Sequence, residues 1–285
     1  MINPFEFRTV PATQVAWEGA KRLGEIVGSR FAARRALLVT DAGLVKAGLI
    51  APIVANLNDV GFEVTVFDKV VPDPPESVVQ GCVEEARQAG ADIVIGLGGG
   101  SSLDIAKLAA VLLASDQPLA DMYGIGKVQG SRLPLVLVPT TAGTGSEVTN
   151  ISIITTGETT KMGVVAPQLY AGFVLLDAEL TVGLPQLHTA ATGIDAMVHA
   201  LEAYTSQHKK NPLSDAFARE ALRLLGRHLV TACHEPTNRE AREGMLLGAT
   251  LAGQAFSNSP VAAVHALAYP LGGHYHVPHG ALPTP

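Results

Sequence analysis

Cysteines, clusters of basic residues and long apolar runs are scarce in this 285-residue sequence. The two cysteines, Cys82 and Cys233, are far apart and have no CxxC partner, so they indicate neither a disulfide framework nor a thiolate metal site. The formal net charge is -6, and lysines and arginines form no stripe. This charge pattern argues against nucleic acid or an anionic membrane as a partner.

Membrane-spanning and secretory segments are also not indicated. Apolar runs such as residues 108–114 and 133–139 are shorter than the roughly 18 residues that a membrane span needs. The first residues, MINPFEFRTVP, lack the basic and apolar stretches of a secretory signal. We therefore expect no membrane partner and a cytoplasmic location. Hydrophobic residues make up 47% of the sequence, enough for the core of a sizeable enzyme.

The spacing of apolar residues changes near residue 185. Before it, short apolar runs alternate with helical stretches, and the runs lie at 36–40, 62–67, 91–100, 133–141 and 171–177. Near-continuous apolar strands between helices predict a Rossmann-like parallel sheet covered on both faces. After it, apolar residues recur at helical spacing, as at Ile194, Met197, Val198 and Leu201. We therefore expect an α/β domain at 1–185 and an all-α domain at 186–285.

A glycine- and serine-rich turn, GGGSS at 98–102, joins the strand DIVIGL to a helix expected to begin near Leu103. Glycines let backbone N–H groups approach a ligand closely, and a helix N-terminus adds partial positive charge, so the turn suits a pyrophosphate. The alternative is a tight turn without a ligand. The turn has neither the GKS or GKT of a Walker loop nor GxGxxG spacing, which argues against kinase or ATPase chemistry.

Two other segments of the first half could contact a nucleotide. Asp41 ends the strand ALLVT, where an acidic side chain can bond the adenosine ribose and so favour NAD over NADP. The alternative is that Asp41 only caps the next helix. The stretch VPTTAGTGSEVT at 138–149 offers many hydrogen-bond donors and little bulk, and it is either a loop around the cofactor or a polar surface loop.

The second half contains candidate metal ligands. Asp195 and His199 are four residues apart on one helix, so their side chains project together. His265 lies in another helical stretch that Pro270 ends, and His279 lies in the loop after it. One carboxylate with three imidazoles suits Fe(II) or Zn(II) rather than Mg(II). The alternative is that each is an ordinary polar residue, and His274 and His276 are additional to the set.

Four motifs in order resemble the iron-containing, group III alcohol dehydrogenase family. They are GGGSSLDIAK, PTTAGTGSEVT, LLDAELTVGLPQLHTAATGIDAMVHALEAYTS and HALAYPLGGHYHVPHG. The resemblance covers nearly the whole chain. It implies a dehydroquinate synthase-like architecture, with a Rossmann-like α/β dinucleotide-binding domain and a helical metal-binding domain. It also implies hydride transfer between a small alcohol or diol and NAD, giving the aldehyde or ketone, with iron, or zinc, acting as a Lewis acid.

The resemblance assigns roles to individual residues. The implied metal ligands are Asp195, His199, His265 and His279, and the implied cofactor-binding residues are Asp41, Gly99, Gly100, Ser101, Thr140, Thr141, Thr149, Lys161 and Leu180. Lys161 is expected to orient the cofactor rather than act as a base. The catalytic set is His265, His279 and Tyr269. Tyr269 stands where many members have a second histidine, and because a phenol is a poor proton shuttle at neutral pH, the ribose, water or His274 can release the proton instead.

The resemblance also bears on the end of the chain. Family members continue with further helices after the PHG motif, whereas this sequence ends at PHGALPTP. We therefore expect a shortened helical domain with exposed apolar faces, and a homo-oligomer. Two alternatives to the dehydrogenase remain. One is a maleylacetate reductase-like or glycerol dehydrogenase-like relative, and the other is a non-catalytic nucleotide-binding remnant.

Overall fold

The computed structural model describes residues 4–157 and 160–260. The described chain divides into two compact units, which we call the α/β unit (10–140 and 150–177) and the helical unit (4–9, 141–149 and 178–260). The chain therefore passes between units at 9/10, 140/141, 149/150 and 177/178. The expectation that 1–185 and 186–285 are separate folding domains stays a prediction.

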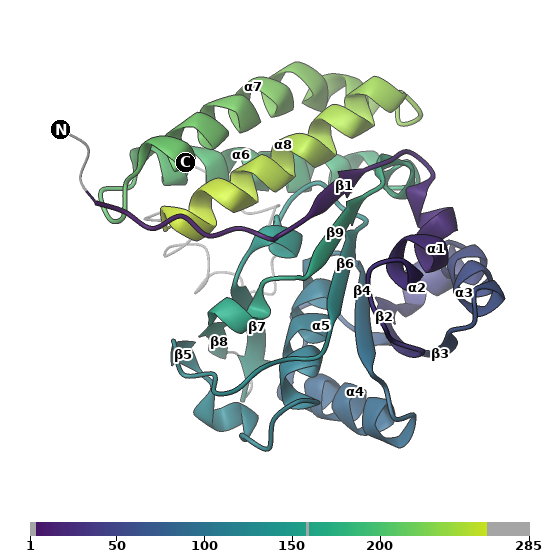
Figure 1. The fold of residues 1–285 in the computed structure, drawn as a ribbon. Helices are drawn as coiled ribbons and strands as arrows, with labels where there is room; N and C mark the ends of the chain where they lie inside the picture. The colour runs from purple at the N-terminus through teal and green to yellow at the C-terminus, as the bar shows by residue number, and fades with distance from the viewer. Residues whose placement is uncertain (1–3, 158–159, 261–285) are drawn as a thin grey trace. The chain divides into compact units, whose positions relative to one another are not determined.

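The α/β unit is built on a six-stranded parallel sheet, which confirms the predicted fold class (Figure 1). Its strand order is β1-β9-β6-β4-β2-β3, and every pair is parallel. The bounds are β1 Thr13–Val15, β2 Arg35–Asp41, β3 Glu63–Val70, β4 Ile93–Gly98, β6 Leu135–Pro139 and β9 Phe173–Leu176. Strands β4, β6 and β9 are buried along their whole length because helices leave neither face in water.

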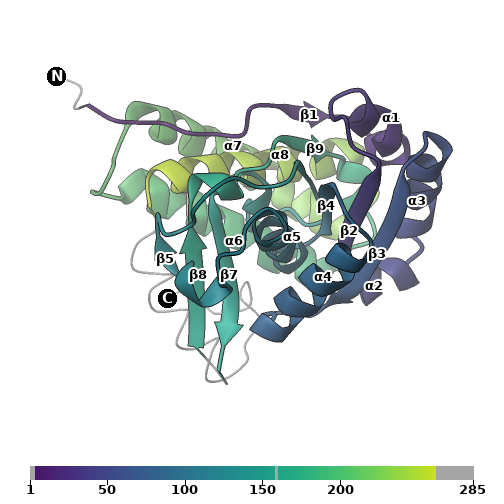
Figure 2. The same cartoon turned by 60° about the horizontal axis from the view of Figure 1, so that its bottom comes forward.

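Helices cover both faces of this sheet (Figures 1 and 2). On one face α1 (Leu23–Gly28) packs against α3 (Ile50–Asp59), and on the other α4 (Glu76–Gln88) packs against α5 (Gly100–Leu112). The short helix α2 (Ala42–Lys46) follows β2 directly. This arrangement is the one that right-handed crossovers between parallel strands produce.

A second sheet of three strands packs beside α5, with the order β5-β8-β7. Its strands are β5 Gly124–Ile125, β7 Ile151–Thr156 and β8 Thr160–Val165. The fully buried Lys107 of α5 donates from Nζ to the Ile151 carbonyl at 2.8 Å, and Asp104 accepts from the Ile153 N–H at 2.9 Å. Polar contacts therefore join this sheet to α5.

The helical unit contains three long helices, α6 (Gln186–Thr205), α7 (Pro212–His234) and α8 (Arg239–Asn258). Asparagine side chains cap two of them, because Asn211 accepts from the Ser214 N–H at 2.9 Å and Asn238 from the Ala241 N–H at 3.1 Å. The helices pack closely: a Cβ at Gly248 would lie 2.9 Å from Leu225 Cγ. None of the described helices is long and apolar enough to cross a membrane.

Candidate functional site

Three sequence-predicted residues lie at the carboxyl ends of adjacent strands in the α/β unit. Asp41 ends β2, Gly99 follows β4, and Thr140 follows β6. Strands β4 and β6 pair Gly98 with Pro139, and the Thr140 N–H donates to the Gly98 carbonyl at 3.0 Å. Strand β2 has β3 on one side and β4 on the other, so the strand order reverses here. Such a switch point is where open α/β sheets bind dinucleotides.

The glycine-rich turn forms the start of α5, three residues before the predicted helix start. Gly99 is the N-cap and makes no side-chain hydrogen bond to the helix. The N–H groups of the first turn, those of Gly100 and Ser101 among them, have no acceptor within the helix and are available to an anion. A Cβ at Gly98 would lie only 2.6 Å from Ser102 Oγ, so the turn requires glycine. The geometry suits a pyrophosphate.

Asp41 has the capping role that its position allowed. Its Oδ1 accepts a hydrogen bond from the Leu44 N–H at 3.1 Å, which caps α2. A carboxylate has a second oxygen, so capping and bonding to a ribose hydroxyl are compatible. The side chain is partly exposed at the end of β2. The assignment of Asp41 to the ribose stays a prediction.

Lys161, on β8, is held by a residue that the sequence analysis missed. Its Nζ lies 2.6 Å from Asp73 Oδ1, and the Lys161 side chain is 15% exposed. Asp73 has a φ of 48°, a left-handed conformation that costs energy for a residue other than glycine. The Thr155 hydroxyl donates to the Asp73 carbonyl at 2.9 Å. An ion-paired ammonium suits an orienting role, and no sequence pattern indicated this pairing.

The remaining three cofactor candidates, Thr141, Thr149 and Leu180, belong to the helical unit. Thr141 and Thr149 lie at the two ends of loop 141–149, and Leu180 lies in the short helix Ala178–Thr181. Thr149 is buried and donates from Oγ1 to the Ser146 carbonyl at 3.3 Å. A Cβ at Gly143 would lie 2.8 Å from Thr192 Cβ of α6. Loop 141–149 therefore packs directly on the helices.

Asp195 and His199 form a buried polar pair on α6. His199 Nε2 lies 4.0 Å from Asp195 Oδ1, and the side chains are 7% and 9% exposed, respectively. Two atoms that each bond one metal at about 2.0–2.2 Å are at most about 4.4 Å apart. The distance in this pair lies within that limit, so the carboxylate and the imidazole, each a good ligand of Fe(II) or Zn(II), can reach one divalent ion.

The buried face of α6 differs from the one that its large apolar residues suggested. Ile194 is 43% exposed and Leu201 is 51% exposed, whereas the buried residues beside the polar pair are small: Ala196, Ala200 and Ala203. Small side chains face α7 and α8 because the helices approach closely. Of the polar pair, the His199 ring stacks on Phe256 of α8, with 4.5 Å between the ring centroids.

The other proposed ligands, His265 and His279, and the catalytic candidate Tyr269 lie outside the described residues, as do His274 and His276. Within residues 4–157 and 160–260 no group of three or more His, Cys, Asp or Glu side chains could hold a metal ion. The complete ligand set and the catalytic set therefore stay predictions.

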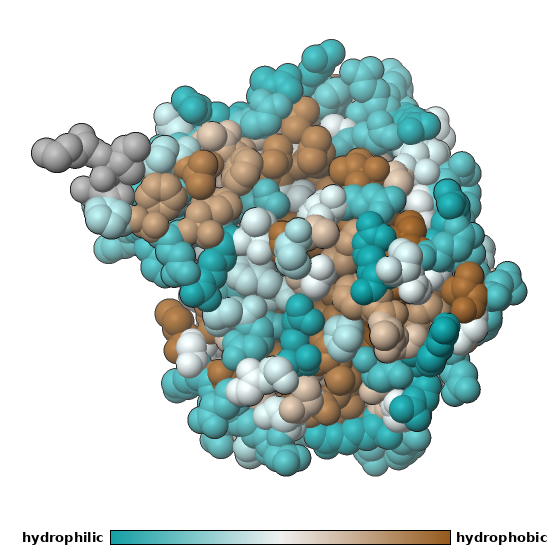
Figure 3. Space-filling view, in the orientation of Figure 1, coloured by the Kyte–Doolittle hydropathy of each residue, from teal (hydrophilic) through white to brown (hydrophobic). Residues whose placement is uncertain are grey.

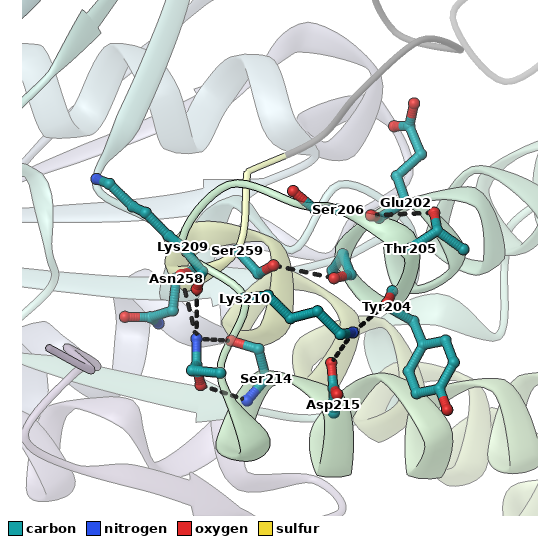
Figure 4. Close-up of polar contacts among 12 residues, drawn as sticks. Glu202, Tyr204, Thr205, Ser206, Lys209, Lys210, Ser214, Asp215, Asn258 and Ser259 are labelled. Carbon is teal, nitrogen blue, oxygen red and sulfur yellow. Dashed lines mark hydrogen bonds and ion pairs between the residues drawn. The ribbon is translucent and has the colours of Figure 1, made fainter. Parts of the chain in front are cut away.

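The last described turn of the chain is anchored beside the ligand-bearing helix (Figure 4). The Ser259 hydroxyl donates to the Ala203 carbonyl at 2.9 Å, one turn after His199 on α6. Asn211 donates from Nδ2 to Ser214 Oγ at 2.9 Å and to the Asn258 carbonyl at 3.3 Å. The chain thus leaves α8 next to α6. His265 is six positions after Ser259 in the sequence, and a chain of this length can span at most about 20 Å.

A dinucleotide cradle at a switch point and a buried carboxylate–imidazole pair are the features of a metal-dependent oxidoreductase. Comparison with known proteins agrees with this class. Residues 14–178 match the family described as "Iron-containing alcohol dehydrogenase", and residues 189–283 match "Fe-containing alcohol dehydrogenase family, C-terminal". The chain belongs to the iron-containing alcohol dehydrogenase family.

Individual relatives support this assignment. The chain is 46% identical over 273 residues to long-chain-alcohol dehydrogenase 1 of Geobacillus thermodenitrificans, covering 95% of this chain and 68% of that protein. A crystal structure of a 1,3-propanediol oxidoreductase matches with a TM-score of 0.93 at 36% identity, covering 98% of this chain and 72% of the other. Sulfoacetaldehyde reductase from Bifidobacterium kashiwanohense, solved in complex with NAD+, matches with a TM-score of 0.90 at 31% identity, covering 98% and 73%.

Proposed function

We propose that the protein is an NAD-dependent, metal-containing alcohol dehydrogenase that acts on a small alcohol or diol. The buried Asp195–His199 pair carries the proposal, because it places a carboxylate and an imidazole, both good ligands of Fe(II) or Zn(II), side by side in the helical unit. The relatives agree in class, since they include a long-chain-alcohol dehydrogenase, a 1,3-propanediol oxidoreductase and a reductase bound to NAD+.

In the proposed reaction a hydride leaves the carbinol carbon of the alcohol for C4 of the nicotinamide of NAD+. The hydroxyl proton passes to water, and the products are the aldehyde or ketone and NADH. The metal, when bound, supplies a Lewis acid for the substrate oxygen. Asp195 and His199 are two of its ligands, the N–H groups of Gly100 and Ser101 bind the pyrophosphate, and Lys161 orients the cofactor.

The buried Asp195–His199 pair also helps to distinguish between the alternative enzyme types. A maleylacetate reductase-like enzyme reduces an enoate without a metal, so it would gain nothing from a buried carboxylate beside an imidazole. A glycerol dehydrogenase-like enzyme with zinc would use the same ligands. The geometry therefore favours a metal-dependent branch, and metal analysis distinguishes iron from zinc.

The test combines metal analysis of the purified protein with NADH formation on a panel of small alcohols and diols. We expect about one divalent metal per chain and alcohol-dependent NADH formation. His199→Ala should lose most of the metal, because each lost ligand weakens the site. His188→Ala is the matched control, since His188 is exposed on the same helix. Cofactor binding without metal or turnover would instead identify a non-catalytic nucleotide-binding protein.

We also propose that the protein forms homo-oligomers in the cytoplasm, where NAD is supplied. Apolar residues gather over α8 on the face shown in Figure 3. Large apolar side chains of the helical unit remain exposed, among them Phe5 at 41%, Leu213 at 45% and Val230 at 67%. Exposed apolar patches commonly mark interfaces. Light scattering of the purified protein that gave the mass of a single chain would contradict the oligomer, and fractionation of cells tests the location.

A further inference from the structure

One face of helix α8 contacts both parts of the candidate site that lie in the helical unit. The Thr250 hydroxyl donates to Glu147 Oε1 at 2.8 Å, which joins α8 to loop 141–149. Six residues later the ring of Phe256 stacks on the His199 imidazole, with 4.5 Å between centroids. Residues 250, 253 and 256 lie within about a third of the helix circumference at 100° per residue. Helix α8 therefore contacts both loop 141–149, the proposed cofactor loop, and the proposed metal ligand His199.

The loop and the helix meet at backbone contact distance between these two interactions. A Cβ at Gly253 would lie 2.8 Å from Gly145 Cα, and a Cβ at Gly145 would lie 2.6 Å from Gly253 Cα. Gly145 also has a φ of 62°, which favours glycine. The two backbones thus leave no space for a side chain at either position. The loop can occupy only one register along α8 while this contact is kept.

The hydrogen bond that fixes the register is itself buried. Glu147 and Thr250 are each 2% exposed. A side-chain hydrogen bond in such surroundings is stronger than one at the surface, because water does not compete for its donor and acceptor. Replacing the hydroxyl of Thr250 should therefore shift or loosen the loop rather than leave it in place.

We propose that Thr250 and Glu147 are positioning residues for the cofactor loop, residues 141–149, and that Phe256 is a positioning residue for the metal ligand His199. This inference rests on the proposed function. The rise of 1.5 Å per residue fixes about 9 Å between residues 250 and 256 along the axis of α8. Hydride transfer requires reacting atoms about 3–3.5 Å apart, and errors of about 1 Å are costly. Helix α8 sets the spacing between the loop that carries Thr141 and Thr149 and the ligand His199.

The test measures NADH affinity, metal content and thermal midpoint separately for each variant of the full chain. Thr250→Val removes the hydroxyl at nearly constant volume and should weaken NADH binding by up to about tenfold, because the energy of one lost hydrogen bond limits how far the loop can be shifted from its binding position. Its metal content should be unchanged. Thr250→Ser keeps the hydroxyl and should restore affinity to within about twofold. Thr250→Ala is the second variant without the hydroxyl.

Phe256→Leu provides the reverse pattern. It removes the ring that stacks on His199, so metal content after dialysis against a weak chelator should fall by about half or more, while NADH affinity stays within about twofold. Leu247→Ala is the control, because Leu247 lies on the exposed side of the same helix. It should change neither binding reaction.

Two results would overturn the positioning roles. One is NADH affinity in Thr250→Val and Thr250→Ala equal to that of the unmodified protein. The other is a parallel loss of NADH and metal in every α8 variant, Leu247→Ala included, which would indicate general destabilisation. If the unmodified protein bound neither NADH nor metal, the proposed function itself would fail. If the unmodified protein bound both NADH and metal and the variants bound them equally well, only the positioning roles would be refuted.

Discussion

Replacing Asp41 by asparagine separates its structural role from its proposed role at the cofactor. Its Oδ1 caps α2 through the Leu44 N–H at 3.1 Å. Asparagine caps helices as well as aspartate does, so Asp41→Asn should leave the thermal midpoint within about 1 °C. Asp41→Ala loses the cap, worth about 1 kcal/mol, which corresponds to about 2–4 °C for a domain of this size. Because no residue of α2 is buried, we expect the lower end.

The charge of Asp41 determines the second effect. Two unit charges about 4 Å apart repel by about 1 kcal/mol in water and about 4 kcal/mol near a protein surface, and a phosphate carries about 1.5–2 negative charges. Removing the carboxylate charge should therefore favour a 2′-phosphate by at least about 1.4 kcal/mol, or tenfold. The preference for NADH over NADPH should fall by at least about tenfold in Asp41→Asn and in Asp41→Ala.

Fluorescence titrations with NADH and NADPH, done in parallel on the three proteins, measure this ratio. Raising the salt concentration should reduce the difference, because salt screens a partly exposed charge. If the unmodified protein bound NADPH as tightly as NADH, or if Asp41→Asn left the ratio within about twofold, Asp41 would be a helix cap and nothing more.

Three further predictions concern buried polar groups. Burial raises the pKa of the Cys82 thiol to about 12, so above about pH 9 the folded state keeps a proton that the unfolded state loses, and the protein should lose stability as the pH rises towards 12. Urea denaturation at pH 8 and pH 10.5 measures this loss, and Cys82→Ala should remove its dependence on pH. Lys107→Met should lower the free energy of unfolding by about 1–3 kcal/mol, because it removes a fully buried cation that pairs with the partly buried Asp104 and donates to the Ile151 carbonyl. The ion pair of Lys69 with Glu85 lies at the surface, so Lys69→Met should have a much smaller effect, and equal effects would contradict the burial argument. Arg242→Met removes a 2.8 Å hydrogen bond to the Pro236 carbonyl and a 3.1 Å hydrogen bond to Thr189, and should lower the free energy of unfolding by about 1.5–3 kcal/mol. An unchanged thermal midpoint would contradict this prediction.

The parallel sheet was predictable because its strands are buried on both faces. Strands such as IVIGLG and LVLVP are unbroken apolar runs of 6 and 5 residues, and runs this short are typical of buried strands rather than of helices. The hairpin β7–β8 gave no such signal, since its residues alternate only partly between buried and exposed and it depends on the buried Lys107 and Asp104 of α5. Its existence follows from tertiary contacts.

The candidate site was predictable where local spacing determines it. The four-residue interval between Asp195 and His199 places both on one side of any helix. That this side is the buried one could not be read from the sequence, because alanines rather than Ile194 or Leu201 face the neighbouring helices. The Glu147–Thr250 bond joins residues 103 positions apart, and such a contact leaves no local pattern.

The division of the chain affects how this protein can be recombined with its relatives. Loop 141–149 lies in the helical unit although both of its neighbours in sequence lie in the α/β unit. A chimera with one crossover near residue 178 would combine the loop of one parent with helix α8 of the other. A side chain larger than glycine contributed by either parent at position 145 or 253 would then collide with backbone. Folding chimeras therefore need to inherit loop 141–149 and α8 from the same parent.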